Sequence, residues 1–168
     1  TREVEGPITR AQERIAQARF RAFGDTIYPD ATFTARVTYG RVLGWTEPSG
    51  RAVPAFTHFD GLWTRATGAD PFKLSPTWVA AESALDPQTI FDVSSSNDII
   101  GGNSGSPLLD REGHVVGAVF DGNIYSLGGE YFYDGSLNRT VSVASTAIKA
   151  ALTQVYHADA LMAELQAQ

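Results

Sequence analysis

A serine flanked by glycines is the feature of this sequence that most clearly suggests chemistry. Residues 101–107 read Gly-Gly-Asn-Ser-Gly-Ser-Pro, so Ser104 lies in a loop that precedes the apolar pair Leu108 and Leu109. Glycine adopts φ values closed to other residues and lets the backbone approach a substrate closely. Such a loop can expose a serine hydroxyl beside converging backbone N–H groups, which is the arrangement that acyl transfer requires. A plain Gly/Ser turn between two strands is the alternative interpretation.

A nucleophilic serine also needs a general base, and the base needs a carboxylate that orients it. The chain contains three histidines. His114 opens a predicted strand directly after a turn, and His157 interrupts a terminal helix, so we expect both at the surface. His58 is the remaining candidate, although no recognisable motif surrounds it. A self-contained endopeptidase that uses His58 therefore stays open as one hypothesis.

The composition describes a globular protein rather than a disordered one. The 168 residues are 43% hydrophobic and 19% charged, enough for one domain with a sizeable core. The net charge is −6 without a Lys/Arg cluster, which argues against a nucleic-acid partner, and no apolar run approaches a membrane span. The absence of cysteine excludes disulfides and thiolate metal sites, and we predict neither a metal nor a cofactor.

Hydrophobic periodicity predicts one helix at the start of the chain, over residues 8–23, with Pro7 at its entry and Gly24 just past its end. After a turn at residues 28–31, alternation over 33–39 predicts a half-buried strand. This strand is expected to resume over 42–45 and to form a hairpin with 53–57.

The remaining elements are expected to surround the serine loop. Prolines in residues 60–88 predict loops and short helices that cover the end of a sheet. The predicted strands are 89–94, which runs into the loop, 106–109, a buried strand over 114–120 that breaks at 121–123, and short strands at 131–133 and 140–143. From Ser145 the chain turns helical, with a break at 157–159. We therefore predict a mainly β fold, barrel-like, with flanking helices.

The serine loop resembles the nucleophile loop of chymotrypsin-like serine proteases. That resemblance implies that Ser104 is the nucleophile and that the N–H groups of Gly102 and Ser104 form the oxyanion hole. Residues 116–119, Val-Gly-Ala-Val, fit the strand that leads to the S1 pocket in that family. Phe120, Asp121 and Gly122 would then lie along the bound peptide, with Gly122 leaving the S1 wall open to a sizeable apolar P1 residue.

A more specific resemblance covers nearly the whole chain. Five motifs stand in an order similar to the C-terminal part of the bacterial S46 peptidases, the dipeptidyl-peptidase 7 and 11 family: Tyr28–Thr34, Val37–Gly40, Asn97–Pro107, Phe120–Asn123 and Arg139–Thr140. Members of this family are periplasmic or cell-surface exopeptidases that remove dipeptides from the free N-terminus of oligopeptides. The resemblance implies a chymotrypsin-like double barrel, a helical capping domain and a homodimer.

The resemblance also implies roles for several residues near the loop. Glycine at position 122 resembles the dipeptidyl-peptidase 7 type, with apolar or aromatic P1, whereas arginine there goes with Asp/Glu. Asp121 is a candidate partner for the substrate's α-ammonium group, or simply a turn-forming Asp before Gly. Asp98 is expected to cap the turn beneath the serine rather than to bind a basic P1 side chain. In activated zymogens of the chymotrypsin-like family, an Asp at the position of Asn103 binds the buried N-terminal ammonium group. Asn103 lacks that carboxylate, so the sequence does not support activation of this kind.

The missing base suggests that the chain is part of a longer enzyme. We expect the triad His and Asp on sequence upstream of Thr1, residues 1–24 to end a helical capping domain, 25–143 to form most of the second barrel, and 144–168 a C-terminal helix. The partners would be an oligopeptide substrate and the N-terminal part of the same protease. The alternative hypothesis is a non-catalytic peptide-binding domain that keeps the barrel and the pocket but has lost the chemistry.

Overall fold

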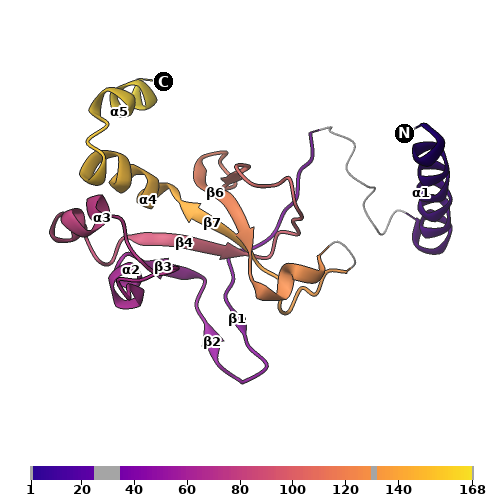
Figure 1. Ribbon diagram of the computed structural model, residues 1–168, viewed down its shortest axis with the longest axis horizontal. Helices are drawn as coiled ribbons and strands as arrows, with labels where there is room; N and C mark the ends of the chain where they lie inside the picture. Colours follow the sequence, from indigo (N-terminus) through magenta and orange to yellow (C-terminus); the bar gives the residue numbers. More distant parts are fainter. Residues whose placement is uncertain (1, 25–34, 130–131, 168) are drawn as a thin grey trace. The chain divides into compact units, whose positions relative to one another are not determined.

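A computed structural model describes residues 2–24, 35–129 and 132–167. The chain divides into two compact units, residues 1–37 and residues 38–168. The first contains helix α1, Arg2–Phe23, and the second contains a sheet with its covering helices (Figure 1). None of the described helices has the length and apolar composition needed to span a bilayer.

Helix α1 begins earlier than predicted. Pro7 lies inside the helix rather than at its entry, because the residues before it are also helical. Proline removes one backbone hydrogen bond, but the helix continues through it to Phe23. Gly24 ends the helix with a φ of 56°, a left-handed conformation typical of a helix C-terminus, and this end is as predicted.

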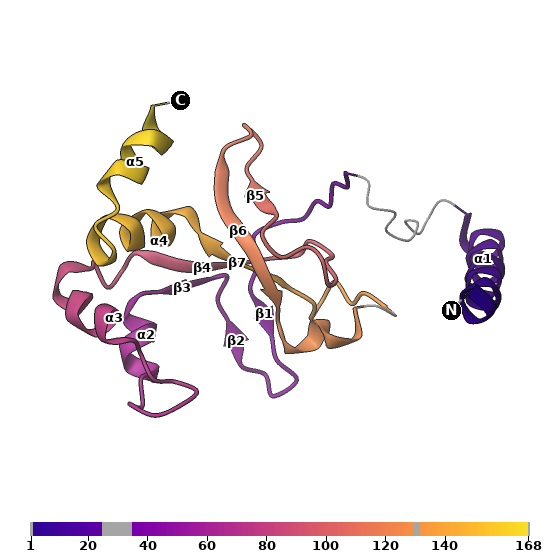
Figure 2. The same cartoon turned by 45° about the horizontal axis from the view of Figure 1, so that its top comes forward.

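A five-stranded antiparallel sheet forms the centre of the second unit, with strand order β3-β4-β7-β6-β5 (Figures 1 and 2). The strands are β3 (Phe56–His58), β4 (Ile90–Ser95), β5 (Pro107–Leu109), β6 (Val115–Gly122) and β7 (Thr140–Ala144). The mainly β fold with flanking helices is thus confirmed. The described residues leave β3 and β5 as open edges and form no closed barrel.

A separate two-stranded hairpin precedes the sheet and pairs β1 (Trp45–Thr46) with β2 (Ala52–Val53). The hairpin predicted between 42–45 and 53–57 is confirmed only at Trp45 and Val53, because β3 takes residues 56–58 and pairs with β4. Gly50 adopts the positive φ of 87° that the hairpin turn requires. The strand predicted over 33–39 is wrong for residues 35–39, where Val37 and Tyr39 are 93% and 92% exposed and no described strand pairs with them. A β conformation needs a hydrogen-bonding partner, and that pairing begins only at Val42, which bridges Ser95. Residues 28–34, including the predicted turn, lie outside the described residues.

The hydrophobic core lies where the helices meet one end of the sheet (Figure 1). Phe59 is fully buried and packs its ring against Trp63, Trp78 and Phe91. The helices that supply this core are α2 (Asp60–Arg65), α3 (Pro76–Ala81), α4 (Ser145–Ala150) and the π-helical η4 (Ala151–Val155). The core residue Leu85 follows the 3₁₀ turn η2 (Glu82–Ala84). The short helices predicted within 60–88 are therefore confirmed.

Three further expectations are corrected around β6 and β7. β6 is half exposed rather than buried, because Val115, Val116 and Phe120 face away from the core. It also continues to Gly122, pairing with β7, and ends only at Asn123. Residues 132 and 133 are not a strand; the 3₁₀ helix η3 (Ile124–Gly128) takes up part of this connection, and residue 131 lies outside the described residues. The break at His157, before α5 (Asp159–Gln166), is confirmed.

Replacing Phe59 with alanine tests this core. We expect Phe59→Ala to lower the free energy of unfolding by about 3–5 kcal/mol, because a fully enclosed aromatic side chain leaves a cavity. Urea denaturation followed by tryptophan fluorescence measures the change. Phe72→Ala is the matched control, since Phe72 is 54% exposed, and it should cost less than about 1 kcal/mol. Equal losses for the two variants would contradict this core.

Candidate active site

The candidate site lies at the end of the sheet opposite the helical core. Ser95, Thr140 and Gly122 are aligned across β4, β7 and β6, so the loop after β4 and the turn after β6 leave the sheet at the same end. There they enclose an open hollow of about 170 Å³, smaller than the pockets of several hundred Å³ that hold drug-sized ligands. The residues that line the hollow are Ile99, Ile100, Gly101, Asn103, Ser104, Phe120, Asp121, Gly122, Asn123, Ser126 and Leu127.

Two positive φ angles, 100° at Gly102 and 84° at Gly105, shape the backbone of the serine loop. Three loop N–H groups are engaged: Asn103 donates to the Ile100 carbonyl at 3.2 Å, Gly105 to the Val119 carbonyl at 2.7 Å, and Ser106 to the Asn103 carbonyl at 3.0 Å. The N–H groups of Gly102 and Ser104, in contrast, donate to no acceptor among the described residues. These are the two donors expected to form an oxyanion hole.

The hydroxyl of Ser104 faces the backbone of β6, where its Oγ lies 3.4 Å from the Phe120 carbonyl oxygen. A β-bulge occurs at this point, because Val119 and Asp121 oppose the consecutive residues Ser142 and Val141. β5 pairs with β6 only as far as Ala118, so residues 120–122 have no described partner strand on that side. Bulges next to active sites re-aim side chains and end pairing, and here the result is a free strand edge beside the serine.

Gly122 and Asp121 form the wall of the hollow next to this edge. The Oδ1 atom of Asp121 accepts a hydrogen bond from the N–H of Gly122 at 2.8 Å, as a turn-forming Asp does. No described residue donates to its Oδ2, and the residue is exposed, so the carboxylate can still receive a cation. A Cβ atom added to Gly122 would lie 2.8 Å from the Cβ of Ser126, closer than real side chains approach. A side chain at position 122 therefore fits only if Ser126 shifts.

A buried polar network supports the wall from behind. The guanidinium of Arg139, 5% exposed, donates to the backbone carbonyls of Gly44, Gly135, Ser136 and Asn138. Asn123 is also buried; its Nδ2 donates to the Leu137 carbonyl at 2.7 Å, and its Oδ1 accepts from the Arg139 N–H at 3.1 Å. Sequence reasoning assigned no role to either residue. The sequence signal that could have identified them is their place in the family motifs Phe120–Asn123 and Arg139–Thr140.

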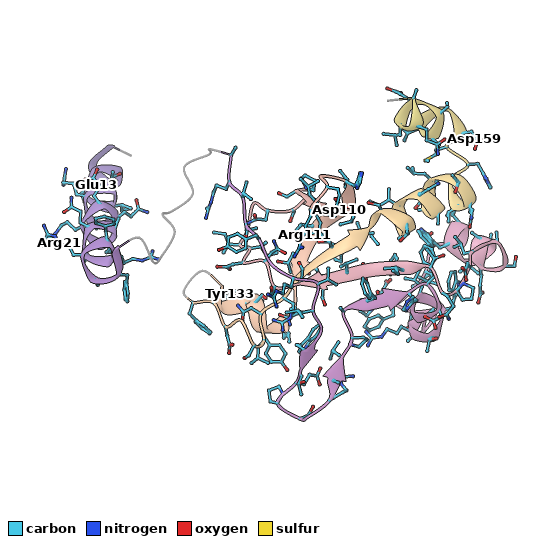
Figure 3. All side chains as sticks on the ribbon, turned by 180° about the vertical axis from the view of Figure 1, so that it is seen from behind. Glu13, Arg21, Asp110, Arg111, Tyr133 and Asp159 are labelled. Carbon is cyan, nitrogen blue, oxygen red and sulfur yellow. The ribbon has the colours of Figure 1, made fainter. Side chains whose placement is uncertain are left out.

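The three histidines do not join the hollow. His58 pairs with Ile90 at the start of β4, about 17 Å along the strand from Ser95. His157 lies between η4 and α5. His114 follows the β5–β6 turn, where its Nδ1 lies 2.9 Å from Asp110 Oδ2 (Asp110 is labelled in Figure 3). Among the residues that the structure describes, no histidine therefore lines the hollow beside Ser104.

Three further residues near the hollow, Asn103, Asp98 and Tyr133, belong to the structure that surrounds the serine loop. Asn103 donates from Nδ2 to the Ile100 carbonyl at 2.8 Å and so closes the turn before the serine. Asp98 does not line the hollow, and partial burial raises the pKa of its carboxyl. Tyr133, labelled in Figure 3, donates its hydroxyl to the Ser96 carbonyl at 2.6 Å, and burial is the main cause of its raised pKa. This bond holds the segment after β4 close to the loop that precedes β7.

Asp110, Glu112 and His114 place one donor atom each within 4.8 Å of one another. All three are exposed, in the β5–β6 turn. The Asp110 carboxylate already accepts from the N–H groups of Glu112 and His114, at 3.0 and 2.8 Å, and its pKa is lowered chiefly by the His114 side chain. These bonds account for the cluster as a turn, so it is not assigned to a metal.

Comparison with known proteins gives one family. The family model described as Peptidase S46 matches residues 1–167. The dipeptidyl-peptidase 7 of Phocaeicola vulgatus is 34% identical in an alignment of 124 positions that covers 68% of this chain and 17% of the relative. The Asp/Glu-specific dipeptidyl-peptidase of Shewanella putrefaciens is 30% identical in an alignment of 169 positions that covers 83% of this chain and 23% of the relative. The matches thus span about a fifth of these relatives' length.

The fold matches a solved structure as well. The crystal structure of Porphyromonas endodontalis DPP11 in complex with the dipeptide Arg-Asp superposes with a TM-score of 0.84 at 22% identity. The match covers 96% of this chain and 25% of that one. At this identity the likeness concerns the fold.

Removing Asn123 tests the network behind the wall. Asn123→Ala is expected to lower the free energy of unfolding by about 2–4 kcal/mol, because it leaves the buried Arg139 N–H and Leu137 carbonyl without partners. Denaturant titration measures the loss. Asn97→Ala is the control and should cost about 1 kcal/mol, since among the described residues the Asn97 side chain makes one bond, from Nδ2 to the Thr38 carbonyl. A loss for Asn123→Ala no larger than the control's would count against the network.

Proposed function

The chain belongs to the peptidase S46 family, and we propose that it is the nucleophile-bearing part of a serine dipeptidyl-peptidase. The observation that carries the proposal is the serine loop, in which the N–H groups of Gly102 and Ser104 donate to no acceptor among the described residues, while those of Asn103 and Gly105 are engaged. Donors fixed in this way can stabilise the oxyanion of an acyl-transfer transition state.

In this proposal, Ser104 Oγ attacks the carbonyl carbon that follows the second residue of the substrate, and its proton passes to a general base. The carbonyl oxygen becomes the oxyanion and accepts from the N–H groups of Gly102 and Ser104. Collapse of the tetrahedral intermediate breaks the peptide bond, and the base returns the proton to the leaving amine. Water then attacks the acyl-enzyme, which releases the dipeptide and restores the serine hydroxyl.

The substrate peptide would lie along the free edge at residues 120–122, where it can add hydrogen bonds as an extra strand. Its P1 side chain enters the hollow, whose Ile99, Ile100 and Leu127 walls favour apolar or aromatic P1 residues. Gly122 keeps this wall free of a side chain, in agreement with a dipeptidyl-peptidase 7 type of preference. Asp121 binds the substrate's α-ammonium group, which selects peptides with a free N-terminus.

The general base and its carboxylate belong, in this proposal, to sequence outside these 168 residues. Two observations support it: no histidine lines the hollow among the described residues, and the matched relatives are about four times as long as this chain. The N-terminal part of the protease would also complete a chymotrypsin-like double barrel around the open sheet, in which residues 25–143 form the second barrel. Residues 1–24 end a capping helical domain, and 144–168 form the C-terminal helical segment, which is interrupted at His157. We further propose that the full protein is a homodimer in the periplasm or at the cell surface.

A fluorophosphonate probe tests the nucleophile. We expect it to label Ser104, located by mass spectrometry, in a protein extended through the upstream gene sequence but not in the 168-residue chain, because a serine without its base is a weak nucleophile. Ser104→Ala should abolish labelling and lower kcat by about 10⁴-fold or more. Absence of labelling in both forms would favour the non-catalytic peptide-binding domain. Labelling of the short chain would mean that its base lies within these residues.

Asp121→Asn tests recognition of the free N-terminus in the extended enzyme. The change should lower kcat/KM for dipeptide release by about 10–100-fold, since a charge-assisted hydrogen bond contributes about 1.5–3 kcal/mol. Asp110→Asn is the matched control, because Asp110 lies in the β5–β6 turn, outside the hollow, and it should leave kcat/KM unchanged. Equal values of kcat/KM for wild type and Asp121→Asn would remove Asp121 from the ammonium site.

A further inference from the structure

Ser126 lies directly behind the backbone of Gly122 and lines the hollow. The position of a Cβ atom at Gly122 is 2.8 Å from Ser126 Cβ and 3.2 Å from Ser126 Oγ. The next atom it would meet is the Arg139 carbonyl oxygen, at 3.6 Å. The space that glycine leaves open at position 122 is therefore filled by the side chain of Ser126.

Hydrogen bonds hold Ser126 in this place. Its Oγ lies 3.0 Å from Asn123 Oδ1 and 3.3 Å from the Arg139 carbonyl oxygen, and the hydroxyl can donate to either. Its backbone N–H donates to the Asn123 carbonyl at 2.8 Å, in the first turn of η3. Because Asn123 and Arg139 are themselves buried, Ser126 cannot move back without breaking their network.

We propose that Ser126 is a specificity-determining residue that sets the depth of the P1 pocket. This inference rests on the proposed function, in which the hollow receives the P1 side chain. Glycine at position 122 opens the wall, and Ser126 then limits how far a side chain can enter. The two positions act as one unit, because a side chain at 122 fits only if the side chain at 126 is removed or displaced.

Three variants of Ser126 in the extended enzyme test the role with dipeptidyl substrates that differ in P1, phenylalanine against alanine. Ser126→Val adds a methyl group and should lower the Phe/Ala ratio of kcat/KM about 10-fold, since one methyl-sized change in an apolar pocket gives 10- to 200-fold discrimination. Ser126→Gly should raise the ratio. Ser126→Ala is the matched control, since it removes the hydroxyl at nearly constant volume, and should leave the ratio within about twofold.

The inference is overturned if the ratio stays within twofold of wild type in both Ser126→Val and Ser126→Gly, or if Ser126→Ala changes it as much as they do. If wild type releases no dipeptide from either substrate, the proposed function fails instead, and the two failures remain distinct.

The pairing of positions 122 and 126 is tested without any activity, on the 168-residue chain. Gly122→Ala should lower the Tm by about 5 °C, because the added methyl group contacts Ser126 too closely. The double variant Gly122→Ala/Ser126→Gly should recover most of this loss relative to Ser126→Gly alone. If the Tm shift of the double variant equals the sum of the shifts of the two single variants, the pairing is overturned.

Discussion

The pairing of β7 between β4 and β6 is the constraint on which the candidate site depends. The serine loop follows β4 and the pocket wall ends β6, and these two strands do not touch. Only the register of β7, which places Thr140 beside both Ser95 and Gly122, brings the two segments to the same end of the sheet. Arg139, the residue before Thr140, then fills the space behind the wall. A register shift of one residue would move every side chain of β7 to the other face and separate these contacts.

The two ends of the sheet are stabilised by different interactions. At one end, the aromatic cluster around Phe59 encloses apolar side chains beneath the helices and supplies stability. At the other end, buried polar groups such as Asn123 and Arg139 replace an apolar core. Polar networks of this kind stabilise less than apolar packing, but they fix one geometry when every partner is present. Exposed apolar residues near this end, such as Leu127 at 80% exposure, form the wall of the hollow rather than a core.

The sequence alone predicted the elements that depend on local patterns. The end of α1 at Gly24, strands β4 and β7, and the position of the serine loop follow from glycine and from alternation. The sequence-based prediction failed where the structure depends on strand pairing and on burial. Residues 35–39 have a strand pattern but no partner strand in the described part of the chain. The apolar composition of β6 predicts a buried strand, but half of it is exposed. The Asn123–Arg139 network could not be derived, because it joins residues 16 positions apart through backbone carbonyls that carry no sequence signal.

The geometry of the serine loop explains why its sequence is so rich in glycine. Gly102 and Gly105 adopt positive φ angles, which shape the turn of the loop. The Gly105 N–H donates to the Val119 carbonyl on β6 and anchors the loop to the sheet, whereas those of Gly102 and Ser104 donate to no acceptor among the described residues. Unpaired donors reduce stability, and an exposed loop can leave them to water at little cost. The same anchoring then holds them in place, so that a developing negative charge meets donors that need no rearrangement.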